Sequence, residues 1–136
     1  RICVSFQIKR RINMNLDFQD IFNELLNILP SGWENAIFMA EYTSGSYSMR
    51  CYSKESNNNY INVMKMKGIS KPQVIKTYKA LNDIFQKERM ELVESSWYAI
   101  TLKFDKNGKF SSDFDYNSHE ENVLEYLEQW EQKNVL

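Results

Sequence analysis

Apolar residues recur at three- and four-residue spacings in three separate segments of the chain, and this spacing predicts three helices. The first helix covers residues 16–29. The second begins after Ser70, which serves as its N-cap, and Gln73 completes a capping box. The third begins after Ser118 and has Glu121 at the capping-box position. Its core-facing residues are predicted to be Val123, Leu124, Leu127 and Trp130.

Shorter segments rich in aromatic and β-branched residues lie between these helices and predict strands. Three strands follow the first helix, at Trp33–Tyr42, Tyr47–Ser53 and Tyr60–Met64. Two more, Trp97–Asp105 and Lys109–Tyr116, lie between the second and third helices. The order is α-β-β-β-α-β-β-α, with short turns between neighbouring strands. This order predicts a single α+β domain with a mostly antiparallel sheet of about five strands and three helices.

The last two strands form a hairpin whose register follows from its apolar positions. A two-residue loop would mix polar and apolar side chains on each face. A three-residue loop, Lys106–Gly108, instead sets Phe104 opposite Phe110. It also sets Ile100 opposite Phe114, so that one face of the hairpin is apolar and the other polar. The sequence therefore predicts the longer loop.

The polar face of this hairpin carries the motif Asp113-x-Asp115-x-Asn117. Carboxylate and amide side chains at this spacing occur in calcium-binding loops. Here the position that needs a glycine holds Ser118, and the position that needs a bidentate glutamate holds Leu124, so a calcium loop is excluded. A solvated strand face is the plain interpretation. The alternative is a metal-dependent hydrolase that uses Asp113 and Asp115.

Other signatures of catalysis are missing from the sequence. The single histidine, His119, lies among glutamates at the predicted start of the third helix and is interpreted as a solvated surface residue. With only 4 glycines, the sequence contains no glycine-rich phosphate loop, and it contains no nucleophile triad or His-Cys metal cluster. We therefore expect that the protein is not an enzyme and that it needs no cofactor or metal.

The composition indicates a globular protein of the cytoplasm. Hydrophobic residues make up 43% and aromatic residues 14% of the chain, which is too much for a disordered segment. No apolar run approaches the roughly 18 residues that a membrane span requires, so no membrane association is expected. Cys3 and Cys51 are too few for a disulfide scaffold and are expected to be reduced thiols.

The net charge of −1 conceals an uneven distribution of charge. Four basic residues and no acidic ones precede Met14, which leaves 13 basic against 18 acidic residues in the remainder. An acidic domain binds nucleic acid poorly, because that affinity comes from lysine and arginine on phosphates. It suits a basic protein partner better. The expected partner-binding patch consists of carboxylates from the hairpin and the third helix: Asp113, Asp115, Glu121, Glu125 and Glu128.

Residues 1–13 differ in character from the rest of the chain. The triplet Lys9-Arg10-Arg11 can be encoded by DNA that contains a bacterial ribosome-binding sequence, and Met14 follows after a short spacer. On this interpretation residues 1–13 are an upstream-translated, non-native extension, and the domain comprises residues 14–136. A genuine basic N-terminal strand is the other interpretation, because apolar and polar residues alternate from Ile2 to Ile8.

Four short segments have a distinctive order and spacing: Ile28–Glu34 (ILPSGWE), Ala40–Tyr42 (AEY), Ile69-Ser70 and Gly108–Tyr116 (GKFSSDFDY). Together they resemble the YezG family of bacterial immunity proteins. The resemblance extends over about residues 16–130, and residues 1–13 have no counterpart in it.

The resemblance implies a cytoplasmic antitoxin that acts by protein binding. Members of that family neutralise a polymorphic, often nuclease-type toxin that Gram-positive bacteria export, notably through type VII secretion. The implied partner is a cognate toxin domain with a basic surface. An acidic protein suits such a partner, because a nuclease presents basic groups to the phosphates of its substrate.

Overall fold

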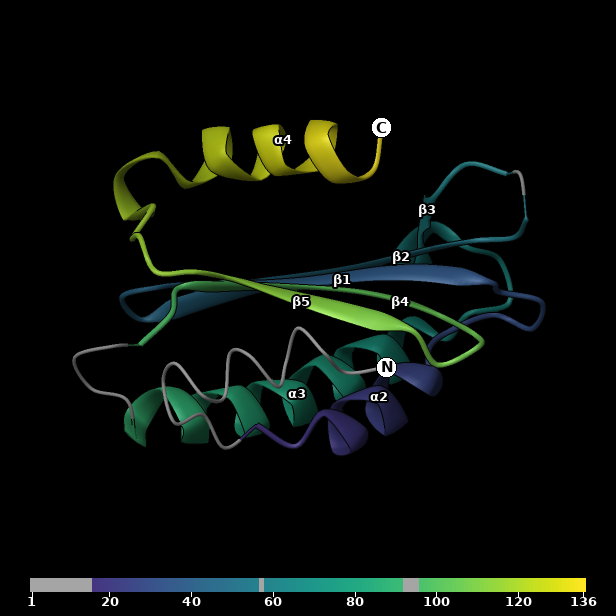
Figure 1. Cartoon of the computed structure of the whole chain (residues 1–136), viewed down its shortest axis with the longest axis horizontal. Helices are drawn as coiled ribbons and strands as arrows, with labels where there is room; N and C mark the ends of the chain where they lie inside the picture. Colours follow the sequence, from purple (N-terminus) through teal and green to yellow (C-terminus); the bar gives the residue numbers. More distant parts are fainter. Residues whose placement is uncertain (1–15, 57, 92–95) are drawn as a thin grey trace.

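The computed structural model describes residues 16–56, 58–91 and 96–136. The expectation for residues 1–13 falls outside this part of the chain and stays a prediction. Two helices lie against one face of a five-stranded sheet, and a third helix lies against the other face (Figure 1). The elements, in chain order, are α2 (Phe18–Leu26), β1 (Asn35–Thr43), β2 (Ser46–Lys54), β3 (Ile61–Asn62), the 3-10 turn η1 (Val63–Lys65), α3 (Lys71–Glu91), β4 (Ala99–Asp105), β5 (Phe110–Asp115), the 3-10 turn η2 (Glu120–Asn122) and α4 (Val123–Asn134).

The strand order in the sheet is β3-β2-β1-β4-β5, and every neighbouring pair is antiparallel. The predicted α+β domain and its element order are therefore confirmed. The third strand is shorter than the predicted Tyr60–Met64, because the Asn62 side chain accepts a hydrogen bond from the Met64 N–H at 2.9 Å and starts η1.

The predicted register of the β4–β5 hairpin is confirmed. Phe104 lies opposite Phe110, and Ile100 lies opposite Phe114. One Asp105 carboxylate oxygen accepts hydrogen bonds from the N–H groups of Asn107 and Lys109, at 2.9 and 3.1 Å, and this fixes the three-residue loop. Gly108 has a φ of +92°, the left-handed conformation that such a loop needs.

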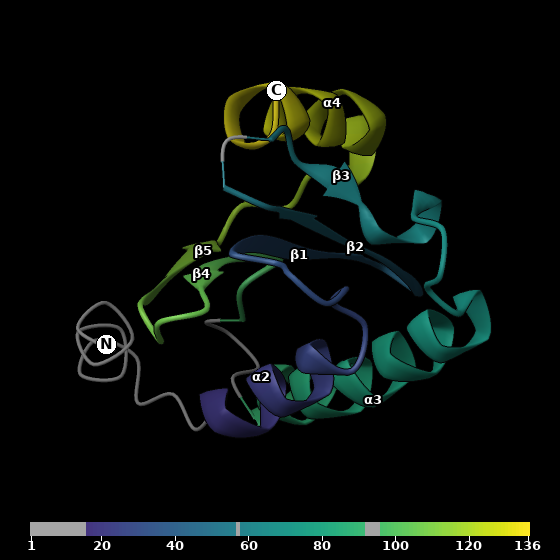
Figure 2. The same ribbon diagram turned by 90° about the vertical axis from the view of Figure 1, so that its right-hand side faces the viewer.

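The larger core lies between the sheet and the helices α2 and α3, on the lower side of the sheet in Figures 1 and 2. Phe38, Leu81 and Phe85 are fully buried there. The predicted cap of α3 is confirmed, because Ser70 Oγ accepts a hydrogen bond from the Gln73 N–H at 3.2 Å. The capping box is not closed, since the Gln73 side chain donates to Thr77 Oγ1 instead.

A smaller core lies on the opposite face of the sheet, beneath α4 (Figure 2). Leu127 and Trp130 pack there against Ile37 and Met39 of β1 and Tyr52 of β2. The Trp130 indole N–H donates to Thr101 Oγ1 at 2.8 Å, which ties α4 to β4.

Two expectations for the last helix are wrong. The α-helix begins at Val123 and not directly after Ser118, because the turn η2 intervenes and Ser118 Oγ accepts from the Glu120 N–H within that turn, at 3.4 Å. Glu121 therefore closes no capping box. Leu124 is also not a core residue, since its side chain is 80% exposed on the outer side of α4. No helix in the described part of the chain is long and apolar enough to cross a membrane.

We expect Leu81→Ala to lower the free energy of unfolding by about 2–5 kcal/mol, because it removes a fully buried side chain and leaves a cavity. The matched control on the same helix is Ile75→Ala, whose side chain is 47% exposed and whose loss should cost far less. Urea unfolding of both variants measures the difference. Equal losses would contradict the assignment of the α3 core face.

Candidate functional site

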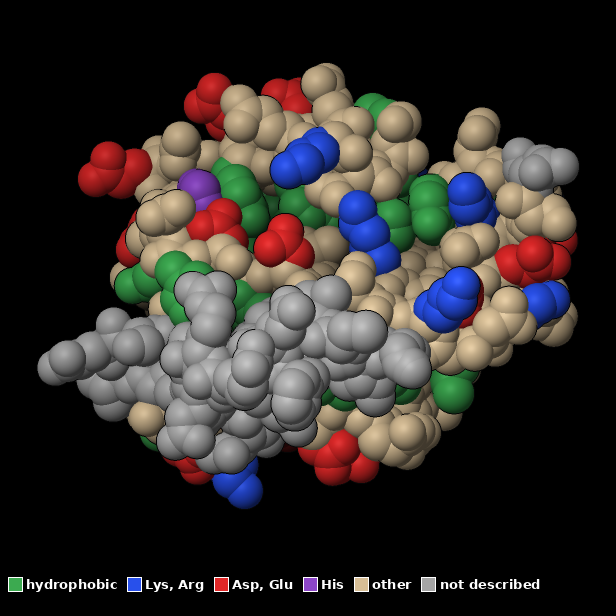
Figure 3. All heavy atoms as spheres, viewed as in Figure 1, with side chains coloured by type: hydrophobic (Ala, Val, Ile, Leu, Met, Phe, Trp, Pro, Cys, Tyr) green, Lys and Arg blue, Asp and Glu red, His purple; other side chains and the backbone are tan. Residues whose placement is uncertain are grey.

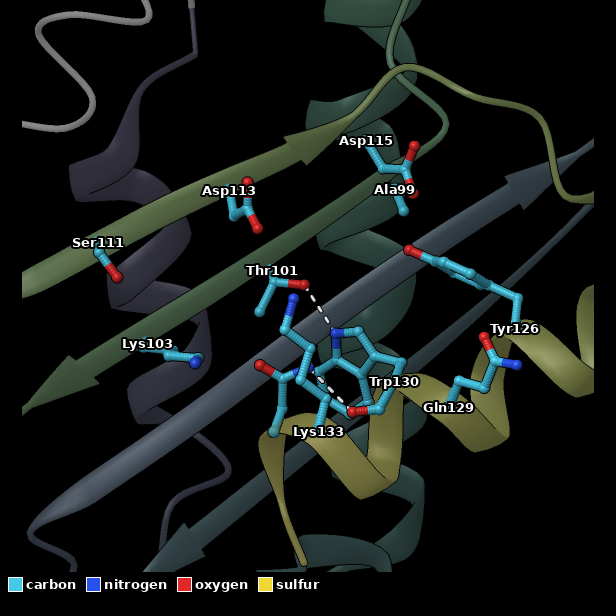
Figure 4. A pocket seen from close by; sticks show the side chains of 11 residues that line it. Ala99, Thr101, Lys103, Ser111, Asp113, Asp115, Tyr126, Gln129, Trp130 and Lys133 are labelled. Carbon is cyan, nitrogen blue, oxygen red and sulfur yellow. Dashed lines mark hydrogen bonds between the residues drawn. The ribbon is translucent and has the colours of Figure 1, made fainter.

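A groove of about 380 Å³ lies between α4 and the β4–β5 hairpin, and we call it the hairpin groove (Figure 4). Its floor consists of alternate residues on the two strands, whose side chains point away from the larger core. The floor residues are Ala99, Thr101 and Lys103 of β4 and Ser111, Asp113 and Asp115 of β5. They alternate along the strands with Ile100 and Leu102, which are fully buried in the larger core.

One wall of the hairpin groove is the side of α4 that carries Tyr126, Gln129, Trp130 and Lys133. These residues recur at three- and four-residue spacings and therefore lie on one side of the helix. Figure 4 shows the Tyr126 hydroxyl pointing from α4 toward the strand residues of the groove. The groove is thus bounded by polar strand side chains below and by aromatic and polar helix side chains at one side.

Asp115 is held in place by several donors and is not simply solvated. One carboxylate oxygen accepts from the Asn117 N–H at 2.9 Å, and the other lies 2.8 Å from His119 Nε2. The His119 ring stacks on Tyr126, with ring centroids 3.8 Å apart and an interplanar angle of 11°. The expectation that His119 is a solvated surface residue is therefore wrong, since this side chain is only 21% exposed.

The surroundings of Asp115 favour its charged form. Burial on its own raises the pKa of Asp115. The hydrogen bonds from the Asn117 N–H and from His119, the charge of His119 and a hydrogen bond from Tyr126 outweigh burial, so that the pKa lies below its ordinary value. Burial, together with the nearby Asp115 carboxylate, raises the pKa of Tyr126 above its ordinary value of 10.0.

Glu41 is a buried carboxylate close to His119 and Glu120, at the beginning of α4. It is 2% exposed, and its Oε2 atom has no hydrogen-bond partner among the described residues. Glu41 lies opposite Ala99, and Ala99 lies opposite Asp115, so that the small alanine separates two acidic side chains on one face of the sheet. Burial raises the pKa of Glu41; the charge of His119 opposes this effect and that of Glu120 adds to it.

The structure brings together only part of the predicted patch. Asp113 and Asp115 both line the hairpin groove. Glu121, Glu125 and Glu128 are exposed but do not line it, because they project from the outer side of η2 and α4. Of these three glutamates, Glu125 lies nearest to the groove. Its carboxylate accepts a hydrogen bond at 3.5 Å from the side chain of Gln129, which lines the groove.

Figure 3 shows how charge varies along the same face. Acidic side chains gather around the histidine, and basic side chains follow farther along the hollow between α4 and the sheet. Two aspartates, Asp113 and Asp115, and two lysines, Lys103 and Lys133, line the hairpin groove. In the described residues, no group of three or more His, Cys, Asp and Glu side chains is placed to hold a metal ion.

Sequence reasoning missed three contributors to this site: Glu41, His119 and Tyr126. Glu41 occupies an otherwise apolar strand, and this is a signal that sequence does carry. His119 and Tyr126 meet only because η2 changes the direction of the chain between them. Their spacing of seven residues therefore does not predict the contact unless the turn is known.

A model of the YezG-like immunity protein family matches residues 14–135 of the chain. The chain belongs to the YezG-like immunity protein family. It is also 27% identical over 106 residues to Immunity protein YezG of Bacillus spizizenii, an alignment that covers 73% of this chain and 66% of that protein. The chain thus spans slightly less than two thirds of the length of this relative.

Membership of the YezG-like immunity protein family confirms the resemblance drawn from the four sequence segments. It also favours a non-enzymatic role for the protein. The family match begins at residue 14, and the hairpin groove lies wholly within the matched residues.

We expect Asp115→Asn to destabilise the fold at neutral pH and to have a smaller effect in acid. The folded pKa of Asp115 lies below its unfolded value. The charged group therefore contributes stability above the ordinary aspartate pKa of about 3.9, and this stability is lost as the pH falls through the lowered folded value. Urea unfolding of wild type and Asp115→Asn between about pH 7 and pH 3 measures the difference in their free energies of unfolding, which should shrink as the pH falls.

Glu41→Gln provides a control near the beginning of α4, because its expected effect on stability at neutral pH is opposite to that of Asp115→Asn. The pKa of Glu41 is raised by folding, so the wild-type protein loses stability as the pH rises through that raised value. The glutamine variant should therefore be more stable than wild type at neutral pH, with the difference vanishing in acid. A variant less stable than wild type at pH 7 would contradict this assignment.

Proposed function

We propose that this immunity protein binds a cognate secreted toxin directly and neutralises it by covering a functional surface. The observation that supports this most strongly is membership of the YezG-like family over residues 14–135. The proposed toxin domain is a basic nuclease, exported by a Gram-positive bacterium through type VII secretion, and the complex forms in the cytoplasm of the producing cell. The partner is a protein and not a nucleic acid.

The distribution of charge supports a basic partner. Residues 105–136 hold 8 acidic and 3 basic residues, and they form β5, η2 and α4, which surround the hairpin groove. We propose that the toxin contacts the acidic surface made by this part of the chain: Asp113, Asp115, Glu121, Glu125 and Glu128. Complementary charge accelerates encounter and selects the partner.

Co-expression with the toxin encoded beside the gene tests the function. The immunity protein should restore growth of cells that produce the toxin domain, and the two proteins should purify together as a complex. A protein that neither restores growth nor binds the toxin domain would refute the proposal. Restored growth without a complex would refute direct binding and leave the immunity role in place.

We expect Glu121→Gln combined with Glu128→Gln to slow association with the toxin domain and to flatten its dependence on salt. Both side chains are exposed, and their charges act at long range through water. Stopped-flow association at several NaCl concentrations measures the effect.

The matched control for this pair is Asp83→Asn combined with Glu91→Gln. It removes the same charge from exposed positions on α3, beneath the opposite face of the sheet. Equal effects of the two double variants would show that net charge alone sets the rate, and would contradict the proposed surface.

A further inference from the structure

Positive charge is concentrated in one stretch of the chain, away from the acidic surface around α4. Residues 58–82 contain five lysines and no aspartate or glutamate. This stretch runs from β3 through η1 into the first half of α3, down the side of the molecule that lies at the right in Figure 2. All five lysines are exposed, and together with Ile75 we call them the lysine surface: Lys65, Lys67, Lys71, Lys76 and Lys79.

The charge of these lysines is not neutralised by ion pairs within the described chain. Neither of the two ion pairs found among the described residues includes one of them. Along α3 the next carboxylate is Asp83, one turn beyond Lys79, where the run of lysines ends. Lys87, farther along the same helix, instead shares a groove with Asp20 of α2 and Glu91. The excess of positive charge therefore belongs to η1 and the first half of α3.

An apolar side chain is exposed among these charges. Ile75 is 47% exposed, whereas the neighbouring Val74 is fully buried in the larger core. Lys71 and Lys79 lie one helical turn before and after Ile75, so they share its side of α3. Apolar contact at the centre and charge at the rim is the usual arrangement of a protein interface.

The net charge of the domain decides which kind of anionic partner suits the lysine surface. Residues 14–136 hold 13 basic against 18 acidic residues. Nucleic acid and anionic membranes extend well beyond the Debye length of about 8–10 Å and would also meet the acidic parts of the domain. A protein carries its acidic residues in local patches, and one such patch faces the lysines alone. The observations therefore favour an acidic protein surface over a nucleic acid or a membrane.

We infer that the lysine surface binds an acidic surface of the toxin, with Ile75 as the apolar contact at its centre. This inference rests on the proposed function and adds a second contact, of opposite sign, to the acidic surface around α4. A nuclease that uses metal ions presents both signs, because carboxylates hold its metal ions and basic groups hold its substrate phosphates. The helices α3 and α4 lie on opposite faces of the sheet, so contacts of opposite sign on the two helices fix the orientation of the toxin (Figure 1).

The test compares two double variants in binding to the toxin domain encoded beside the gene. Lys76→Gln combined with Lys79→Gln removes two charges from the lysine surface, and Lys87→Gln combined with Lys109→Gln removes two exposed charges outside it. We expect the first variant to weaken the complex about three- to ten-fold at about 0.1 M NaCl, mainly through slower association. This loss should shrink at about 1 M NaCl, where the Debye length is about 3 Å.

The sign of the effect is as informative as its size. Loss of positive charge at a place that does not contact the toxin should leave the affinity for a basic toxin domain unchanged or raise it. The control variant should therefore bind as tightly as wild type or more tightly. Urea unfolding of both double variants should match wild type, because all four lysines are exposed.

Ile75→Ala tests the centre of the surface without changing its charge. It should accelerate dissociation about five-fold or more at both salt concentrations. The matched control is Met90→Ala near the end of α3, which truncates an apolar side chain that is 75% exposed and lies outside the lysine surface. This control should leave dissociation unchanged.

The outcomes separate the inference from the proposed function. If the wild-type protein does not bind the toxin domain, the proposed function fails and the inference fails with it. If wild type binds and both double variants bind equally well, the inference is overturned and direct binding stands. Wild-type binding to a short DNA duplex that is lost in the Lys76 and Lys79 variant, with toxin binding unchanged, would also overturn it and would assign the lysines to nucleic acid.

Discussion

The central strand β1 is buried on both faces, and the rest of the structure depends on this constraint. Every residue from Ala36 to Tyr42 is buried. Phe38 and its alternate neighbours face α2 and α3, whereas Ile37 and Met39 face α4. A strand with two buried faces needs a layer on each side of the sheet. The last helix is therefore required by the sheet and is not an addition to a finished two-layer domain.

One helix cannot cover a whole sheet, and the hairpin groove follows from this mismatch. An α-helix is about 10 Å wide with its side chains, and neighbouring strands lie about 4.8 Å apart, so a single helix covers about two strands. The helix α4 covers the side where β1 and β2 present Ile37, Met39 and Tyr52. The strands β4 and β5 present Thr101, Lys103 and Asp113 on the same face, and these polar residues remain as the floor of a groove.

The β4–β5 hairpin could be predicted from sequence because its information is local. Side chains alternate between the two faces, and only one loop length placed Phe104 opposite Phe110 and Ile100 opposite Phe114. The same alternation placed Asp113 and Asp115 on the polar face correctly. It gave no sign that α4 would return over that face, because the helix is attached through Trp130 and Leu127 to residues far away in the sequence.

The errors at the start of α4 have a different origin. Ser118 and Glu121 satisfy the spacing of a capping box, but the turn η2 lies between Ser118 and the α-helix. The sequence therefore contains the spacing of a capping box, but no capping box forms. What decides the local conformation is a set of side-chain contacts across the turn: Asp115 binds His119, and His119 stacks on Tyr126. A pattern of caps and spacings contains none of these contacts.

The two ends of α4 are held to the sheet by different forces, and this bears on how the groove can change. Leu127 and Trp130 are buried against apolar side chains, so their contribution does not depend on protonation. The beginning of the helix is held through Tyr126 by Asp115 and His119, above the buried Glu41. Folding shifts the pKa values of Glu41 and Asp115 in opposite directions, so acid favours the fold through one group and opposes it through the other. The beginning of α4, where Tyr126 lies against Asp115 and His119, is thus the end of the helix whose attachment to the sheet depends on charge.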